Sequence, residues 1–125
     1  MSVDDAKLTF AQEANELLQE MEDALLSLEA APDDAELLNS LFRSMHTIKG
    51  AAGVFGFDAI VAFTHPIETE LDRVRNGERA VDSDMVAVLL ECRDHTINLV
   101  DHTLNSDDEE LTPELIERGE ELLKR

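Results

Sequence analysis

The sequence has little that would cross-link or repeatedly bend the chain. It contains a single cysteine, Cys92, so no disulfide can form within it. Tryptophan and tyrosine are absent, aromatic residues make up only 4% of the chain, and there are three prolines and five glycines. A β-sandwich or barrel needs many more turns than this, so the composition favours an all-helical protein.

Positive charge is also scarce. Ten Lys and Arg residues stand against 29 Asp and Glu residues, for a formal net charge of −19. Such a chain repels nucleic acids and anionic membranes, which argues against both as partners. No apolar run reaches the length of about 18 residues that a membrane span needs, and the N-terminus has no apolar signal-peptide region. We therefore expect a soluble cytoplasmic protein, with the isolated domain a monomer.

The hydrophobic residues that are present recur at helical spacing. They make up 43% of the 125 residues, enough for one domain, residues 1–125, with one core. Steps of three and four between apolar residues predict helices at residues 4–29, 34–53, 58–76, 83–104 and 113–124. Four helices of about 20 residues with short connections predict an up-down-up-down antiparallel four-helix bundle. The fifth, shorter helix is expected to be a C-terminal appendage.

Local signals mark where these helices begin and end. Asp33 or Asp34 can cap the second helix, with Glu36 placed to complete a capping box. The second helix is expected to end near Gly53. Gly77 supplies a left-handed residue that ends the third helix.

One edge of the second helix combines a histidine, a lysine and two glycines. At about 100° per residue, with Met45 at the centre of the core stripe, His46, Lys49, Gly50 and Gly53 lie on one flank. Glycine within a helix costs about 1 kcal/mol relative to alanine, so two on one edge need a reason. Missing side chains beside His46 would let another molecule approach it closely.

The third helix places a second pair of polar residues at the same height. If the corner lies near residue 57, His46 is level with Glu68 and Lys49 is level with His65. A carboxylate that accepts from Nδ1–H of His46 would leave Nε2 free to attack phosphorus. Lys49 could then neutralise the oxygens of an arriving phosphoryl group.

Two other functions fit the same residues. The chain could be an acidic helical adaptor or inhibitor in which the histidines are incidental, or a metal-binding bundle that uses His46, His65 and Glu68. The remaining histidines, His95 and His102, are interpreted as structural or surface residues, and no metal site is predicted. Cys92 falls on an apolar stripe and is interpreted as a core residue.

The combined motifs resemble a known family. His46-x-x-Lys49-Gly50, Phe55-Gly56-Phe57, Thr64-His65-x-x-Glu68 and Leu71-Asp72-x-Val74-Arg75-x-Gly77 together resemble the N-terminal histidine phosphotransfer domain of the chemotaxis histidine kinase CheA. The motifs lie within residues 46–77, and the helix pattern extends the resemblance over nearly the whole chain.

The resemblance implies a phosphorelay module that is not an enzyme by itself. His46 would be phosphorylated on Nε2 by the ATP-binding kinase domain of a CheA-type protein. The phosphoryl group would then pass to a receiver aspartate of response regulators of the CheY and CheB kind. Glu68 would bond the phosphohistidine, with Lys49 and His65 beside it. No cofactor is expected in the domain, because ATP would be bound elsewhere.

One residue departs from the family pattern. Pro66 follows His65 where the family commonly has an apolar helix former. Proline cannot donate to the carbonyl of Ala62, and its ring crowds that turn. We therefore expect a kink or local loosening that could move His65 away from the site.

Overall fold

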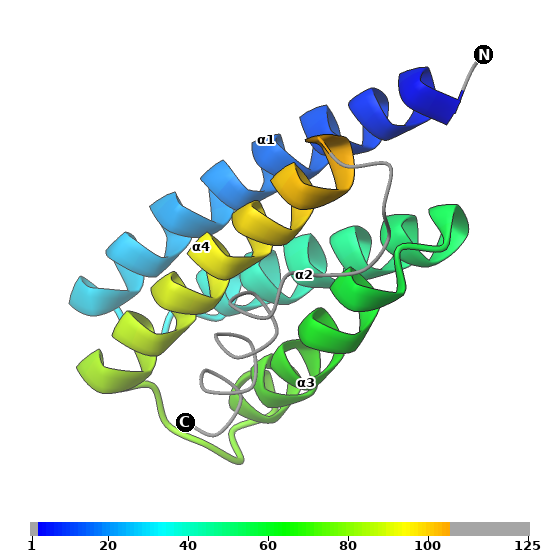
Figure 1. Cartoon of the computed structure of the whole chain (residues 1–125). Coiled ribbons are helices and arrows are strands. Elements are labelled where there is room, and N and C mark those ends of the chain that lie inside the picture. The colour runs from blue at the N-terminus through cyan, green and yellow to red at the C-terminus, as the bar shows by residue number, and fades with distance from the viewer. Residues whose placement is uncertain (1–2, 106–125) are drawn as a thin grey trace.

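A computed structural model describes residues 3–105 as four helices with short connections (Figure 1). They are α1 (Val3–Ala30), α2 (Ala35–Phe55), α3 (Asp58–Arg75) and α4 (Ser83–Asn105). Successive helices run in opposite directions, so the predicted all-α, up-down-up-down bundle is confirmed for this part of the chain (Figure 1). The fifth helix predicted at residues 113–124 lies outside the described residues.

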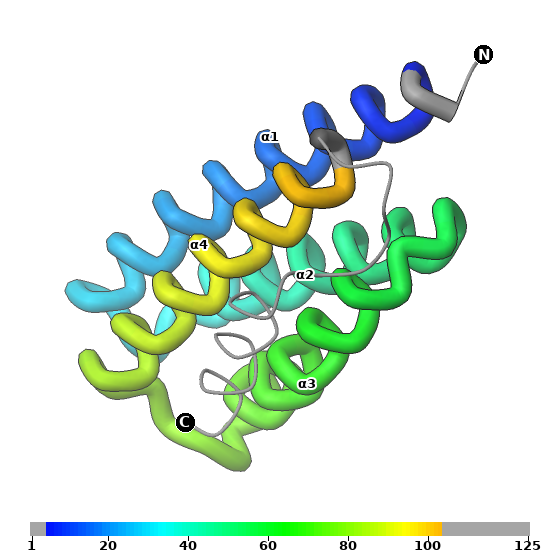
Figure 2. Tube along the Cα trace, in the orientation of Figure 1, coloured from blue at the N-terminus to red at the C-terminus, as the bar shows by residue number. Residues whose placement is uncertain are grey.

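The core forms where the apolar stripes of the four helices meet. α1 packs against both α2 and α4, and α2 packs closely against α3, whereas α3 and α4 contact each other less extensively (Figure 2). The largest fully buried side chains come from all four helices: Phe10, Leu18, Met21, Leu25, Leu28, Leu41, Met45, Ile48, Ile60, Val86 and Leu99. Close packing of α2 on α3 is the feature that brings the polar residues of those two helices together.

The start of α2 differs in one detail from the predicted capping. Asp34 is the N-cap, and its carboxylate accepts from the backbone N–H groups of Glu36 and Leu37 at 3.0 and 3.3 Å. A capping box needs its glutamate three residues after the cap. With Asp34 rather than Asp33 as the cap, Glu36 is only two residues away, so the predicted capping box is wrong.

The end of α2 is also later than predicted. The helix continues past Gly53 to Phe55, and Gly56 adopts the left-handed conformation with φ of 76°. The backbone N–H of Phe57 donates to the carbonyl of Ala52 at 2.9 Å, which closes the helix end. Gly53 is therefore a helical residue on the same continuous helix as His46.

Pro66 does not interrupt α3, which is continuous from Asp58 to Arg75. His65 is not carried away from the neighbouring helix, because its Nδ1 atom lies 3.5 Å from Nζ of Lys49. The displacement expected from the missing N–H of Pro66 therefore does not occur. The third helix ends as predicted, with Gly77 in the left-handed region at φ of 79°.

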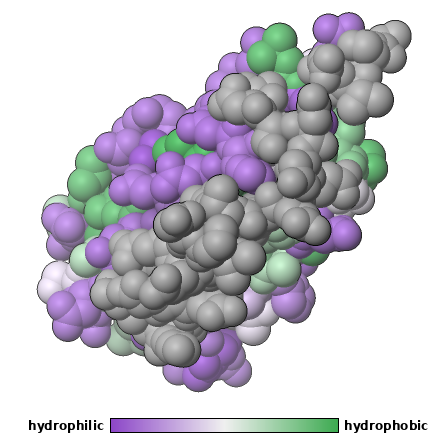
Figure 3. Space-filling model, viewed as in Figure 1, coloured by the Kyte–Doolittle hydropathy of each residue, from purple (hydrophilic) through white to green (hydrophobic). Residues whose placement is uncertain are grey.

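The exterior agrees with the acidic composition. Where described residues are visible in Figure 3, most of the surface is hydrophilic and hydrophobic residues occupy smaller separate areas. Among residues 3–105, no helix is both long enough and apolar enough to cross a membrane.

Candidate functional site

His46 lies on the solvent side of α2 and is held from α3. Its side chain is 62% exposed, and its Nδ1 atom lies 2.7 Å from Oε1 of Glu68, whose side chain is only 12% exposed. The two residues are level because α2 and α3 are antiparallel neighbours joined by a short corner. The structure thus contains the His46–Glu68 contact that the residue spacing predicted.

The second oxygen of Glu68 holds the lysine of the same edge. Oε2 lies 2.5 Å from Nζ of Lys49, and that nitrogen is also within 3.5 Å of Nδ1 of His65. Because an ammonium group can only donate, His65 Nδ1 faces it as an acceptor. All four polar residues predicted for the site are therefore brought together, with Glu68 at the centre.

Glu68 is ionised in this arrangement. Its burial disfavours the charged form, but hydrogen bonds from Lys49 and His46 and the positive charge of Lys49 outweigh burial, so the pKa of Glu68 lies below its ordinary value. An ionised carboxylate only accepts hydrogen bonds, so Nδ1 of His46 must carry the proton that it donates. In the neutral imidazole Nε2 then has a free lone pair.

The two glycines of α2 leave space on the surface near His46. A Cβ atom at Gly50 would meet nothing within 4 Å, and one at Gly53 would meet only Cγ2 of Val61, at 4.0 Å. Both residues are exposed and helical, and neither has a positive φ. Neither the backbone conformation nor internal packing requires glycine at these two positions. The space left by the absent side chains is therefore open to an approaching molecule.

Two residues of the site were not predicted from the sequence. The ring of Phe42 lies parallel to the imidazole of His46, with the planes 9° apart and the centroids 5.9 Å apart. The guanidinium of Arg75, from the end of α3, lies 3.9 Å from the centroid of Phe42. The signal available in the sequence was the four-residue spacing from Phe42 to His46, which places both on one helix face.

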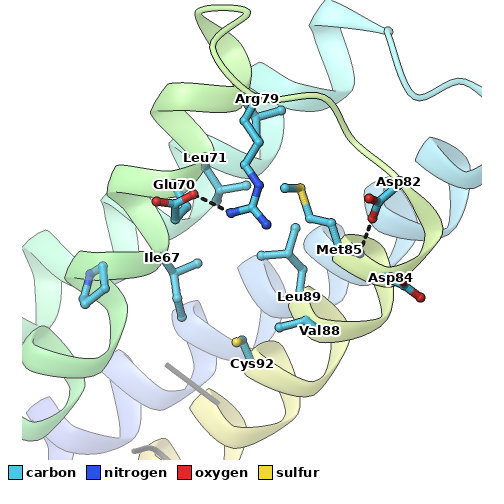
Figure 4. Close-up of a pocket in the computed structure, with 12 residues that line it drawn as sticks. Ile67, Glu70, Leu71, Arg79, Asp82, Asp84, Met85, Val88, Leu89 and Cys92 are labelled. Atoms are coloured by element: carbon cyan, nitrogen blue, oxygen red, sulfur yellow. Dashed lines mark hydrogen bonds and ion pairs between the residues drawn. The ribbon is translucent and has the colours of Figure 1, made fainter. Parts of the chain in front are cut away.

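A hollow elsewhere on the bundle lacks comparable chemistry. It occupies about 350 Å³ between α3 and α4 and is lined mainly by apolar side chains, including Ile67, Leu71 and Leu89 (Figure 4). An ion pair between Arg79 and Glu70, 2.6 Å long, lies at its rim. None of the four polar residues of the His46 cluster lines this hollow, so the candidate site is the α2–α3 edge.

Of the other candidate residues, Cys92 and His95 are buried, whereas His102 is partly exposed. Cys92 is 4% exposed, as expected for a core residue. His95 is 3% exposed and packs edge-on against Phe63, with the ring centroids 4.5 Å apart. Within residues 3–105, no group of three or more His, Cys, Asp or Glu residues is arranged to hold a metal ion. The metal-binding alternative therefore gains no support from the described part of the chain.

The sequence matches one protein family. The sequence model that describes the Hpt domain family matches residues 6–125, which is nearly the whole chain. The chain therefore belongs to the Hpt domain family.

Individual relatives show which kind of Hpt domain this is. The chain is 45% identical over 94 residues to the chemotaxis protein CheA of Salmonella typhimurium, covering 75% of this chain and 14% of that protein. It is 40% identical over 101 residues to CheA of Rhizobium meliloti, covering 81% of this chain and 13% of the relative. The chain is therefore an Hpt domain of the CheA kind, and it spans about one seventh of the length of these relatives.

Solved structures agree at the level of the domain. The CheA phosphotransferase domain from Thermotoga maritima superposes with a TM-score of 0.80 at 36% identity, covering 84% of this chain and all of that one. The phosphorylated P1 domain of CheA3 from R. sphaeroides, solved in complex with CheY6, gives a TM-score of 0.79 at 27% identity and covers 97% of each chain.

Proposed function

We propose that this domain carries phosphoryl groups in bacterial chemotaxis signalling, with His46 as the phosphoacceptor. The observation that carries the proposal is the hydrogen bond from His46 Nδ1–H to the ionised Glu68, which leaves Nε2 of an exposed imidazole as the nucleophile. The Hpt family match and the CheA relatives support this function. The domain then carries a covalently bound phosphoryl group in the cytoplasm, and the kinase activity belongs to a partner domain.

The first step takes a phosphoryl group from ATP bound to a CheA-type kinase domain. The lone pair of Nε2 forms a bond to the γ-phosphorus, the bond from that phosphorus to the β–γ bridging oxygen breaks, and ADP leaves with the electron pair. Both ring nitrogens then carry a substituent, so the phosphoimidazole has a formal positive charge. The carboxylate of Glu68, 2.7 Å from Nδ1, stabilises the charge that develops on the ring.

The second step passes the group to a receiver domain. A carboxylate oxygen of the receiver aspartate forms a bond to phosphorus, the Nε2–phosphorus bond breaks, and its electron pair returns to Nε2. Response regulators of the CheY and CheB kind are the proposed acceptors, and the structure of the related CheA3 P1 domain in complex with CheY6 supports this partner class.

The neighbours of His46 have separate roles in both steps. Lys49 reaches the same carboxylate as His46 and so can supply positive charge to the phosphoryl oxygens from one turn away. His65 contacts Lys49 and helps to place its ammonium group. Gly50 and Gly53 leave open space on the same flank, which allows a receiver or kinase domain to approach the imidazole closely.

Phosphorylation with radiolabelled ATP and a purified CheA-type kinase domain tests the proposal. We expect the wild-type chain to acquire label that is labile in acid and stable in alkali, and His46→Gln to acquire none. Subsequent addition of a CheY-type receiver should remove the label from the domain. Equal labelling of His46→Gln, or no labelling of the wild type by several active kinase domains, would contradict the proposal and favour the acidic adaptor instead.

A further inference from the structure

The exposure of His46 raises the question of what holds its ring. A side chain that is 62% exposed has few neighbours to restrain it, and the contact with Glu68 restrains only the Nδ1 corner of the imidazole. A ring attached at Cβ and held at Nδ1 can still swing about the line through those two atoms. Such a swing moves Nε2, the atom that must meet phosphorus in line.

Phe42 lies where it can restrain this swing. Helical side chains lean toward the N-terminus of the helix, so His46 lies over the preceding turn, to which Phe42 belongs. The two rings are 9° from parallel with centroids 5.9 Å apart, within the range of offset aromatic pairs. Contact with a flat ring face restricts rotation of the imidazole plane in a way that one hydrogen bond cannot.

Phe42 is in turn tied to the neighbouring helix. The guanidinium of Arg75 lies 3.9 Å from the Phe42 ring centroid, and its NH2 group is 2.5 Å from a carboxylate oxygen of Asp72. Both Arg75 and Asp72 belong to α3, the helix that also carries Glu68. His46 is thus connected to α3 twice, directly through Glu68 and indirectly through Phe42 and Arg75.

We propose that Phe42 is a positioning residue for phosphoryl transfer at His46 and that Arg75 supports it. This inference rests on the proposed function, since it concerns the orientation of the phosphoacceptor ring. Phe42 sets the plane of the imidazole, Glu68 sets its tautomer, and together they direct Nε2. The expected effect is on the rate of the reaction, because the orientation of the ring decides how Nε2 meets phosphorus.

Four variants distinguish the effect of the Phe42 ring on the orientation of His46 from the effects of apolar packing and of positive charge. Phe42→Leu keeps an apolar side chain but removes the flat face, whereas Phe42→Tyr keeps the face and serves as the conservative rescue. Arg75→Gln removes the cation above Phe42. Arg73→Gln is its matched control. Arg73 is also on α3 and also pairs with a carboxylate, that of Glu70 at 3.0 Å, but the cation over the Phe42 ring is Arg75.

The decisive measurement is the kinetics of phosphorylation of the 125-residue chain by a CheA-type kinase domain. We expect Phe42→Leu to lower kcat on the order of tenfold with KM unchanged, because misplacement of a reacting atom is felt in the transition state. Phe42→Tyr should restore kcat to within about twofold of wild type. Arg75→Gln should lower kcat by a smaller factor, and Arg73→Gln should leave it unchanged.

A spectroscopic measurement reports the orientation itself. Three-bond coupling constants that report χ1 and χ2 of His46 should show one rotamer in the wild type and averaging between rotamers in Phe42→Leu. The ¹⁵N shift of Nδ1 should remain that of a protonated nitrogen in both, since Glu68 is untouched.

The outcomes distinguish this inference from the proposed function. If the wild type is not labelled at His46, the phosphotransfer function itself fails. If the wild type is labelled and Phe42→Leu has the same kcat, or shows the same single rotamer, the positioning role of Phe42 is overturned. An equal loss of kcat in Arg73→Gln and Arg75→Gln would remove Arg75 from the proposal.

Discussion

The carboxylate of Glu68 lies 2.7 Å from Nδ1 of His46, although 22 positions separate the two residues in the chain. Its other oxygen lies 2.5 Å from Lys49, so one buried glutamate binds two residues of α2 that are one helical turn apart. Removal of its charge should therefore affect both the tautomer of His46 and the position of Lys49.

Replacement of Glu68 by glutamine tests the catalytic consequence of this contact. A hydrogen bond to a charged group contributes about 1.5–3 kcal/mol, so Glu68→Gln should slow phosphorylation of His46 by roughly 10- to 100-fold. Single-turnover labelling with a saturating kinase domain measures the rate. Glu70→Gln is the control, because Glu70 is on the same helix but pairs with Arg73 and Arg79 instead. A rate for Glu68→Gln equal to that of the control would remove Glu68 from the mechanism.

Acid should remove the contribution of Glu68 to stability. Its pKa is lower in the folded chain than in the unfolded chain, so the unfolded state binds the proton more readily. The stabilisation is complete above the pKa of an unfolded glutamate, roughly 4.3, and is lost as the pH falls through the lower folded value. Urea unfolding of wild type and Glu68→Gln across this range should give a stability difference that shrinks on acidification. A difference independent of pH would show that the charge of Glu68 does not stabilise the fold.

Side chains added at Gly53 should have different effects on the stability of the fold and on the rate of phosphoryl transfer. The site has room for a Cβ atom, and replacement of a helical glycine by alanine contributes up to about 1 kcal/mol, so Gly53→Ala should unfold at higher urea concentration than wild type. Gly53→Leu should keep the fold but slow phosphoryl transfer to a CheY-type receiver by at least about tenfold, because the larger side chain occupies the approach to His46.

A leucine on the opposite side of the bundle controls for added hydrophobic surface. Ala87 is exposed on α4, which packs against α1 and α3 rather than α2. Ala87→Leu should therefore transfer its phosphoryl group at the wild-type rate. Equal transfer rates for Gly53→Leu and Ala87→Leu would contradict the close-approach role of Gly53.

Arg93 should matter for folding and not for phosphoryl transfer. Its side chain is 11% exposed, its Nε–H donates to the carbonyl of Leu18 at 2.7 Å, and its NH2 group pairs with Glu22 at 3.0 Å, which ties α4 to α1. Arg93→Ala should lower the free energy of unfolding by about 1.5–3 kcal/mol. The more exposed Arg79→Ala should lower it by less than about 1 kcal/mol. Both variants should be phosphorylated at the wild-type rate under conditions where they are folded. Slower phosphorylation of folded Arg93→Ala would show that the contacts between α1 and α4 influence the site.

The helices, and the heights at which the site residues lie along the α2–α3 pair, could be predicted because they depend on local rules. Apolar spacing of three and four residues defines a helix face, and a short corner forces two helices to run antiparallel. Those two constraints were enough to place His46 beside Glu68 and Lys49 beside His65. The exact end of α2 was harder to predict, because both Gly53 and Gly56 can end a helix and only the fold shows that Gly56 takes the left-handed conformation.

Contacts that depend on side-chain direction could not be predicted in the same way. The pairing of Lys49 with Glu68 as well as His65 depends on the rotation of each helix about its axis and on the rotamers of three side chains. The contact of Arg75 with Phe42 depends on how closely the end of α3 lies to the middle of α2. The expected displacement of His65 by Pro66 failed for a related reason, since a local rule about one missing N–H did not account for the packing of the whole of α3 on α2.

Helical periodicity and short connections are local properties. The sequence alone therefore predicts the helical class of the described chain, the antiparallel order of its four helices and a histidine, a lysine and a glutamate at one height. Tertiary packing is needed to bring one glutamate into contact with both the histidine and the lysine, to stack Phe42 on the imidazole and to place Arg75 over Phe42. These contacts arise from the distance and relative rotation of α2 and α3, which the packing of the entire core sets.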